Sequence, residues 1–560
     1  MKKKIVLGVI FPLCATALLG ACNLRKQSGE SVDSSKTQLY INNFARGFGT
    51  KWLDNLKTQF ESEHAEDSYE DGKKGVQIII HSSNSPIKDN LGNILTKDDE
   101  IYFTEQSSYF QLYDAGVLCD ITSAVTEKLT GYSETKSIED KLTEEQQDYF
   151  GIVKDGTRHY YGVPHYSGFF GLQIDVDLFD EKGFYFAATP LDEGNGRFVT
   201  SRNPVKSAGP DGISGTYDDG FPRTYDEFFA LCDYMVEEGC TPIVGSGANT
   251  SDYINHLVNG FVADYEGKDQ LMNKYRSKGT MVNLVSSINP DGSVTKEAPT
   301  TINNQNGYLA YKSAGNYYGL KFLERMLSKS SYYWDKIKSS SYSAKSAQDD
   351  FLISYSEKSK QQIGMIYEGS WWENESDTTS TSLAQQKGDT YSKMNRRFAF
   401  LPFPKPTMER YLESNKSTLF DHLFSIMFVK ANAASWKMPL INEFVKFCNS
   451  DRSLRDFTVT TNTPKSLNYE LTAEDKAKMT YYGKCLAELK ANADVVYPGC
   501  SDEIFKVHSN EFLNDRQYFT KVDSTVTQYA WNGIYARNYT AEQYFGGMVT
   551  YYQEQWAKWN

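Results

Sequence analysis

The stretch LYINNFARGFGTKWLDNLKTQFE, residues 39–61, decides the fold class, because it reads as a strand, a short loop and a helix in succession. Trp52, Leu56 and Phe60 recur every four residues, the spacing of side chains on one face of a helix. A glycine-flanked turn then leads into a second apolar run at 76–80. A strand, a helix and a second strand in this order predict an α/β domain.

The same order repeats further along the chain. An apolar run at 100–103 is followed by polar residues and then by a second predicted helix, which ends before Gly116. Ligands of open α/β sheets bind in the loops that follow the carboxyl ends of the strands. The loops at 42–46 and 103–106 are therefore candidate ligand loops.

A second block of α/β pattern follows the first. An apolar strand is expected at 171–175, and an amphipathic helix is expected at 225–238. Between them, residues 186–223 are rich in Gly, Pro, Asp and Ser, which predicts an insertion loop. About 500 residues are too many for a single hydrophobic core, so this length predicts two large lobes.

The N-terminus carries the pattern of an export signal. Four residues with three lysines precede an apolar run at 5–20, which is too short to span a membrane. The run ends in Leu-Leu-Gly-Ala-Cys, which resembles the lipobox of bacterial lipoproteins. This resemblance implies a signal peptide at 1–21, lipidation of Cys22, and a tether at 22–36 that holds the protein on the extracellular face of a Gram-positive type cell membrane. The alternative is an ordinary signal peptide followed by an incidental cysteine.

Composition narrows the function. The net charge is −13 and no block of Lys or Arg occurs, which argues against nucleic acid as a partner. The 39 tyrosines combine apolar rings with hydroxyl groups, which suits wet interfaces and contacts to sugars; the alternative is an ordinary core that is rich in Tyr. The chain has no HExxH, GxxxxGK[ST] or GxSxG motif, and its cysteines lack zinc-like spacing, which disfavours the enzyme classes that depend on these motifs.

Several stretches together resemble one protein family. They are residues 39–61 above, DDEIYFTEQSSYFQLYDAGVLCDIT (98–122), HYYGVPHYSGFFGLQIDVDLFDEKG (159–183), QQIGMIYEGSWW (361–372) and DRSLRDFTVTTNTPKSLNYEL (451–471). In this order they are similar to the extracellular solute-binding lipoproteins of bacterial ABC importers, in the carbohydrate (maltose/oligosaccharide-type) branch.

The resemblance implies an α/β fold of the two-lobe, periplasmic-binding-protein-like class (type II), with a mixed sheet in each lobe and crossing strands between them. The implied divisions are lobe 1 at 37–164, lobe 2 at 165–428, a return to lobe 1 at 429–475, and C-terminal helices, mostly of lobe 2, at 476–560.

The resemblance also implies a function. A monomeric, non-enzymatic subunit would capture an oligosaccharide and deliver it to the transmembrane subunits of an ABC permease. The alternatives are a membrane-anchored glycan hydrolase, which would also use carboxylates and aromatic rings, and a binding protein for a solute other than a sugar.

Two adjacent tryptophans follow a Gly-Ser turn in EGSWWENE, residues 368–375. Trp371 falls on the family's Gly-x-Trp position, whose indole stacks on a sugar ring, while Trp372 is expected to be buried packing. Glu368 is a candidate acceptor for sugar hydroxyls, and Glu373 and Glu375 are either further acceptors or solvated acids. The other candidate ligand residues are Asn42, Phe44, Arg46, Glu105, His165, Tyr166, Ser246 and Asn249.

The insertion contains the segment GPDGISGTYDDG, residues 209–220. Three carboxylates among glycines are suited to Ca²⁺, and the segment resembles the Asp- and Gly-rich loops of extracellular calcium-binding modules. Asp211, Asp218, Asp219 and the carbonyl of Ile213 are the expected ligands of a structural Ca²⁺. The alternative is a turn that needs no metal.

Overall fold

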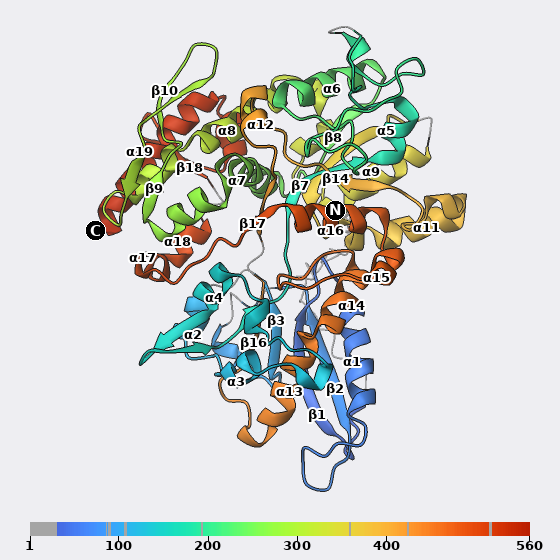
Figure 1. Cartoon of the computed structure of the whole chain (residues 1–560), viewed down its shortest axis with the longest axis vertical. Coiled ribbons are helices and arrows are strands. Elements are labelled where there is room, and N and C mark those ends of the chain that lie inside the picture. The colour runs from blue at the N-terminus through green and yellow to red at the C-terminus, as the bar shows by residue number, and fades with distance from the viewer. Residues whose placement is uncertain are drawn as a thin grey trace, which may run out of the picture.

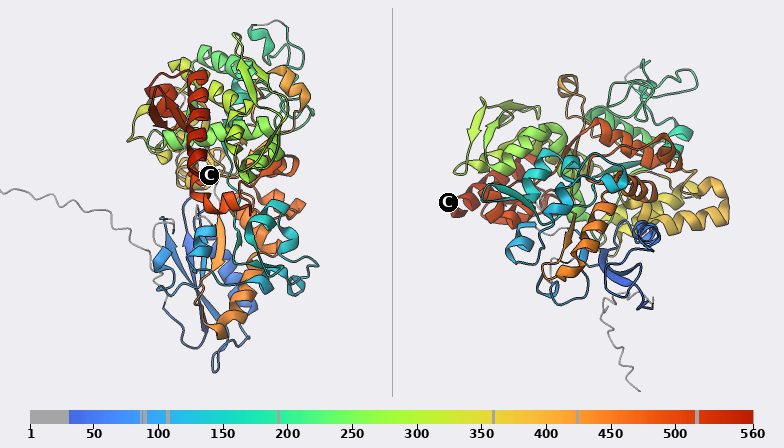
Figure 2. Two further views of the ribbon diagram at one scale, coloured as in Figure 1. Left: turned by 90° about the vertical axis from the view of Figure 1, so that its left-hand side faces the viewer. Right: turned by 60° about the horizontal axis from the view of Figure 1, so that its bottom comes forward.

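The computed structural model describes residues 31–85, 87, 91–105, 109–191, 194–357, 360–422, 425–514 and 518–559. The predicted signal peptide and Cys22 lie outside these residues. Within the described part of the chain, no helix combines the length and apolar character needed to cross a bilayer. The chain forms two bodies that lie one above the other in Figure 1 and in the left view of Figure 2, and each is built around its own sheet.

The sheet of lobe 1 has five strands in the order β2-β1-β3-β16-β6. Strand β1 (Thr37–Phe44) pairs in parallel with β2 (Val76–Ser83) and with β3 (Ile101–Thr104). Strand β16 (Ile426–Val429) runs antiparallel to β3, and β6 (Val163–Pro164) forms the edge. Because β1 and β3 are parallel, the loops that follow them leave the sheet at the same edge, as the sequence predicts.

Helix α1 (Lys51–Glu63) supplies the predicted apolar face of lobe 1. The ring of Trp52 lies 5.2 Å, centroid to centroid, from a phenylalanine of α14 (Asp451–Thr461). The ring of Phe60 lies 5.2 Å from a phenylalanine of α13 (Met438–Cys448). Helices from late in the sequence thus complete the core that the first helix begins.

The sheet of lobe 2 has the order β14-β7-β13-β8. Strand β13 (Ile363–Gly369) lies at its centre, antiparallel to β7 (Phe170–Asp175) and parallel to β8 (Thr241–Val244). Strand β14 (Phe398–Phe400) pairs with β7 at the edge. The long helix α7 (Thr250–Arg276) packs on β7 and on α8, and its φ/ψ regularity breaks at Gly267.

The remaining elements complete the two lobes around these sheets. The other helices include α4 (Glu144–Phe150), α5 (Val176–Lys182), α6 (Tyr225–Glu237), α8 (Ala314–Ser328), α9 (Ala344–Ser356), α10 (Trp372–Glu375), α11 (Asp377–Lys387), α16 (Tyr481–Asn492) and α19 (Ala541–Trp559). Two-stranded ribbons are formed by β4 (Gly151–Lys154) with β5 (Thr157–Tyr160), β9 (Gly279–Met281) with β12 (Thr300–Ile302), β10 (Val285–Ile288) with β11 (Val294–Lys296), β15 (Thr418–Phe420) with β17 (Asp494–Val496), and β18 (Phe519–Val522) with β19 (Thr525–Gln528).

The chain returns to lobe 1 slightly earlier than predicted. The expected division between 428 and 429 falls inside β16, because the whole of this strand pairs with β3 of lobe 1. Further on, α16 packs beside β14 and α19 packs beside α8, so both helices belong to lobe 2.

Crossing segments join the lobes. The first lies between β6 and β7, the second follows β15, and the third follows α14. They are tied to one another, since Tyr166 forms a backbone bridge with Lys465 and Phe169 forms one with Asp421. Two mixed sheets linked by such segments confirm the predicted two-lobe α/β fold class.

Candidate ligand site between the lobes

The loop after β1 lies against lobe 2. Gly47 in this loop has a φ of +78°, a conformation that side chains with a Cβ rarely adopt. A Cβ placed there would lie 3.3 Å from Cγ of Trp371, so the absence of a side chain also allows the indole to approach. Glycine at this position therefore brings the first ligand loop into contact with the tryptophan of the other lobe.

The two adjacent tryptophans have different environments. Trp371 follows the end of β13 and is half-buried, at the contact with lobe 1. Trp372 is fully buried, and its ring meets those of Phe351, Phe398 and Tyr482 nearly edge-on. The prediction that Trp372 is buried packing is confirmed.

Two carboxyl groups lie near Trp371. Glu368 is fully buried in β13, and Glu375 lies at the end of α10. Gln348 Nε2 donates to both, at 2.9 Å from Glu375 and 3.5 Å from Glu368. Burial, together with the charge of Glu375, raises the pKa of Glu368 well above its ordinary value. Burial raises the pKa of Glu375 as well, so this pair of carboxyl groups resists carrying two negative charges.

Glu375 links the two lobes. Its carboxylate accepts a hydrogen bond from the backbone N–H of Gly47, and the nearby Arg46 guanidinium favours its charged form, although burial raises its pKa on balance. On the lobe 2 side, the hydroxyl of Tyr253 in α7 donates to Glu368. Arg46, Gly47, Glu368, Trp371 and Glu375 are called the strand-end cluster below.

Aromatic rings border the strand-end cluster in lobe 2. The ring of Phe170 lies 6.3 Å from that of Trp371 and 4.9 Å from that of Tyr253. His256 and His422 continue this row, with their rings 4.6 Å apart. Phe170, His256 and His422 are buried, whereas Tyr253 and Trp371 are partly exposed. Partly exposed aromatic rings with a polar edge suit the C–H faces and hydroxyl groups of a sugar.

The second ligand loop reaches the first crossing segment. The hydroxyl of Tyr166 donates to the carboxylate of Glu105, and burial together with that carboxylate raises the pKa of Tyr166 well above its ordinary value. The ring of Tyr166 lies 4.2 Å from that of Phe48, in the first ligand loop. The two predicted loops and the crossing segment therefore meet, although Tyr166 itself is buried.

His165 points into the core of lobe 1. Its ring lies between those of Trp52 and Phe103, at 4.9 and 4.6 Å. Nδ1 accepts a hydrogen bond of 2.6 Å from Lys465 Nζ, and burial, followed by the charge of Lys465, lowers the pKa of His165 well below its ordinary value. Its hydrogen-bonding partner is therefore part of the protein interior.

The other candidates of the first ligand loop are also engaged within lobe 1. Asn42 Nδ2 donates to Asp99 at 2.9 Å, and the same carboxylate group lies 2.5 Å from Nδ1 of His81. Phe44 is buried at the end of β1. Arg46 is the exposed member of this group.

Ser246 and Asn249 form the turn that begins α7. The Ser246 hydroxyl donates to Asn249 Oδ1 at 3.1 Å and accepts from the Asn249 N–H at 3.1 Å. Ser246 is fully buried and Asn249 is exposed. The hydroxyl of Tyr367 in β13 donates to the Ser246 carbonyl at 3.3 Å, which anchors the turn beside the strand that carries Glu368.

Carboxylates of the Asp-rich loop bind backbone and hydroxyl groups of the same loop. Asp218 is almost fully buried and accepts from the Asp211 N–H at 3.0 Å and from the Thr216 hydroxyl at 2.7 Å. Asp211 accepts from the Ile213 N–H at 2.7 Å, and Asp219 accepts from a glycine N–H at 2.7 Å. Burial, followed by the charge of Asp211, raises the pKa of Asp218 to about 7. Across the described residues, no three His, Cys, Asp or Glu side chains are grouped so that they could hold a metal.

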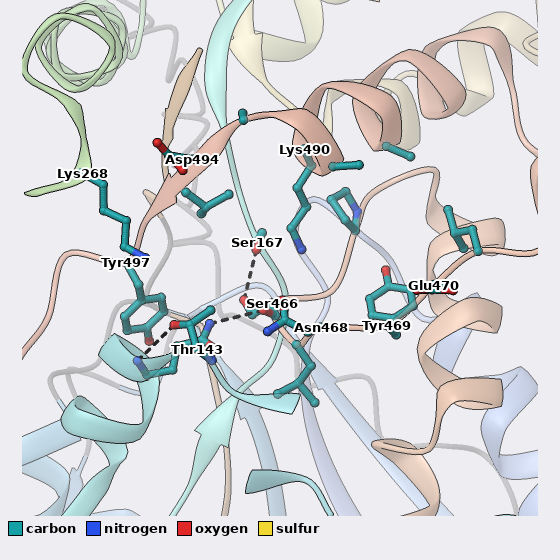
Figure 3. Close-up of a pocket in the computed structure, with 18 of the residues that line it drawn as sticks. Thr143, Ser167, Lys268, Ser466, Asn468, Tyr469, Glu470, Lys490, Asp494 and Tyr497 are labelled. Carbon is teal, nitrogen blue, oxygen red and sulfur yellow. Dashed lines mark hydrogen bonds between the residues drawn. The ribbon is translucent and has the colours of Figure 1, made fainter. Parts of the chain in front are cut away.

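A cavity of about 590 Å³ lies beside the crossing segments, away from the strand-end cluster (Figure 3). Ser167 lines this cavity, whereas its neighbour Tyr166 points to Glu105. Both lobes contribute, through α4 on one side and through α7 and α16 on the other, with residues 464–471 of the third crossing between them. None of the ten predicted ligand residues lines it. This space is called the hinge cavity below.

Sequence reasoning missed several residues of the site. Gln348 and Tyr253 come from helices without a recognisable motif, and Phe170 belongs to an apolar strand. Glu373, which the sequence leaves open as a solvated acid, is buried and accepts from the Thr480 hydroxyl at 2.9 Å. Glu375 lies four residues after Trp371 in a short helical turn. This spacing was the available signal that its carboxylate lies near Trp371.

Comparison with known proteins shows likeness in structure alone. No family model matches the sequence, and no curated protein matches it either. Among solved structures, a chitin oligosaccharide binding protein has a TM-score of 0.52 at 15% identity, covering 93% of this chain and 100% of its own. SBP RafE in complex with raffinose has a TM-score of 0.51 at 12% identity, with coverages of 93% and 99%.

A third structure, from work on xylan utilization by the thermophilic bacterium Caldanaerobius polysaccharolyticus, has a TM-score of 0.53 at 13% identity, with coverages of 92% and 99%. The chain has the fold of the solute-binding proteins. These matches span nearly the whole of this chain and of each matched chain, so the likeness in fold covers both lobes.

Proposed function

We propose that this chain is the extracellular substrate-capture subunit of an ABC importer, and that it binds an oligosaccharide reversibly between its lobes without cleaving it. It then delivers the sugar to the transmembrane subunits of the permease and acts as a monomer. The observation that carries this proposal is the half-buried Trp371 at the point where the loops of both lobes meet.

The surroundings of Trp371 support a sugar as the ligand. An indole face buries the apolar C–H face of a pyranose ring, while Arg46 and Glu375 present polar groups at its edge. Since Gly47 lies against the indole, the lobes must part for a ring to stack there. The similar structures, whose titles name chitin oligosaccharide, raffinose and xylan, supply the classes of sugar to try first.

The deciding experiment is a thermal-shift and calorimetric screen of the purified chain with chitin oligosaccharides, raffinose and xylo-oligosaccharides. A ligand that binds only the folded state raises the melting temperature, so at least one sugar should give a shift and a saturable heat of binding. Chromatography of each bound sugar should recover it intact. If no glycan binds but a peptide or another solute does, the importer function stands and the sugar assignment is wrong.

The hydrolase alternative has weaker support. A glycosidase needs two carboxyl groups that reach the scissile bond from opposite sides. Of the two groups beside Trp371, Glu368 is fully buried and bonded to Gln348 and Tyr253, so it does not face a substrate. Release of shorter sugars in the screen would nevertheless establish hydrolysis.

We also propose that the chain is held at the cell membrane by a lipid on Cys22, with its lobes outside a Gram-positive type cell. The support is the sequence pattern before Cys22. The Cys22→Ala variant should lose incorporation of a labelled fatty acid and should be released into the medium or remain a precursor. Labelling of the variant equal to that of the wild type would contradict this proposal.

A structural Ca²⁺ in the Asp-rich loop is a further proposal. The buried Asp218 beside Asp211 supports it, because a cation there would offset the cost of burying one carboxylate near another. Chelation should lower the melting temperature of the wild type, and the Asp218→Asn variant should no longer respond to Ca²⁺. Identical melting curves with Ca²⁺ and with chelator would contradict the proposal that the loop binds Ca²⁺.

A further inference from the structure

The hinge cavity has walls of two kinds. Its deep polar part consists of the buried side chains of Gln146, Ser167 and Ser466, joined by hydrogen bonds, and of Lys490. The rest of the wall contains apolar residues, among them Pro464, Leu467, Leu471, Ala487, Ala491 and Val495, together with polar and charged residues such as Thr143, Asn468 and Glu470. A cavity of about 590 Å³ with both apolar and polar walls has the size of a small-molecule site.

Lys490 is the charged group that faces the deep part of this cavity. Figure 3 shows its side chain descending from α16 with the ammonium group toward Ser466 and Asn468. Its Nζ donates one hydrogen bond, of 2.5 Å, to the backbone carbonyl of Lys465. Within the described residues, no carboxylate forms an ion pair with it. Burial lowers the pKa of Lys490 to about 8, against the opposing charge of Asp421.

The other charges of the wall are neutralised or exposed. Lys268 forms an ion pair with Glu145 at 3.0 Å, and Asp494 forms one with Lys416 at 2.6 Å. The remaining two charged residues of the wall, Glu470 and Lys476, are exposed. Among the described residues, the hinge cavity therefore offers one partly buried ammonium group that forms no ion pair, although the charge of Asp421 acts on it. Hydroxyl donors lie next to this ammonium group.

We propose that the hinge cavity binds a small organic acid, whose carboxylate accepts hydrogen bonds from Lys490 and from Ser167 or Ser466 and whose apolar body lies along α16 and Leu467. A buried ammonium group gains most from a counter-ion that is brought to it, because water no longer solvates it fully. One available ammonium matches a monocarboxylate better than a doubly charged phosphate. This site is separate from the strand-end cluster and does not depend on the sugar.

The test uses acids paired with neutral compounds of the same shape. Hexanoate and benzoate, with hexanamide and benzamide as their counterparts, are titrated into the full mature chain at pH 7 by calorimetry and by ligand-observed NMR. At least one acid should bind, and its amide should bind at least tenfold more weakly. The Lys490→Met variant should weaken acid binding at least tenfold, whereas Lys490→Arg should retain most of it.

Matched controls separate this site from general charge effects and from the sugar site. Lys476→Met removes an exposed lysine from the rim of the same cavity and should leave acid binding unchanged. Trp371→Ala, in the strand-end cluster, should weaken acid binding far less than Lys490→Met does, because it removes no group from the cavity wall. Equal binding of acids and amides, no binding of either acid to the wild type, or unchanged binding by Lys490→Met would each overturn the proposal. The acid and amide comparison needs no variant, so it decides the question even if Lys490→Met does not fold.

Discussion

The strand-end cluster and the hinge cavity lie on different faces of the same crossing segment, yet they are built in opposite ways. At the cluster, Trp371 is in contact with a loop of lobe 1, and Glu375 of lobe 2 accepts a hydrogen bond from Gly47 of lobe 1. Beside it, Tyr166 of the crossing segment donates to Glu105 of lobe 1. At the cavity, Ser167 lines an open space that both lobes surround. One face is closed by its own side chains, and the other leaves room for a small molecule.

This difference shows how a two-lobe protein can couple two sites. A rotation that separates the lobes at the strand-end cluster changes the width of the space on the other face, because the crossing segments lie between them. A molecule that contacts α4 and α16 together would fit one angle between the lobes best and would favour that population. The following changes test whether the two faces differ in the way described.

The largest expected effect is on stability, at Trp372. Replacing it with Ala removes a fully buried indole from the rings of Phe351, Phe398 and Tyr482, and should lower the free energy of unfolding by about 3–5 kcal/mol. Urea denaturation measures the loss. A change smaller than about 1 kcal/mol would mean that this side of the tryptophan pair is not core, contrary to the structure.

Trp371→Ala is the matched counterpart of Trp372→Ala. Its main effect should be on ligand binding, and this effect should be smaller than the loss of stability in Trp372→Ala. Loss of the stacked indole should weaken oligosaccharide binding by about 1–3 kcal/mol, which is about tenfold or more. The melting temperature should change much less than in Trp372→Ala, because Trp371 is only half-buried. Calorimetry with the best sugar of the screen measures the affinity. A variant with lower stability and unchanged affinity would make Trp371 a packing residue.

The sequence predicts those features of this arrangement that depend on residues close together in the chain. The apolar spacing in 39–61 and the parallel strand pattern predict the loops that hold Arg46 and Glu105, because strand ends are local features. The Gly-x-Trp resemblance predicts Trp371, and the adjacent Trp372 is correctly expected in the core. These features need a few residues of local context, together with one resemblance.

The rest depends on packing between distant segments. Nothing near Gln348 or Tyr253 in the sequence indicates that α9 and α7 bring these residues to Glu368. His165 follows Pro164 in the first crossing segment, as expected. Its hydrogen-bonding partner, Lys465, is 300 residues away in the sequence, so the sequence does not indicate that His165 packs in the core of lobe 1. The hinge cavity likewise arises from segments that meet only in the folded chain.

Lys465 connects the core of lobe 1 with the hinge cavity, because its ammonium donates to His165 while its carbonyl accepts from Lys490. Burial lowers the pKa of Lys465 to about 7 in the folded chain, against about 10.4 in an unfolded one. The unfolded state therefore binds more protons between these values, and stability should rise with pH above 7. Lys465→Met should remove this rise.

The size of the Lys465 effect follows from the titration. Between pH 7 and pH 9, the stability of the wild type relative to the variant should rise by about 2 kcal/mol. Urea unfolding of both proteins at several pH values measures it. Parallel pH profiles would show that Lys465 is not held in a medium that disfavours its charge.

The smallest expected effect lies in the electrostatic attraction between Arg46 and Glu375 at the strand-end cluster. Arg46 is exposed, so its attraction to Glu375 is screened by solvent and should contribute about 0.2–1 kcal/mol. A double-mutant cycle with Arg46→Gln and Glu375→Gln isolates this coupling in the unfolding free energy, and raising the salt concentration should reduce it. The Gly47 N–H still finds an acceptor in the amide oxygen that the Glu375→Gln change introduces, so the cycle removes charge and retains the hydrogen bond. A coupling of zero at low salt would leave the hydrogen bond of Gly47 and its contact with the indole of Trp371 as the ties between the lobes in this cluster. The lobes would then part without losing any charge attraction between Arg46 and Glu375.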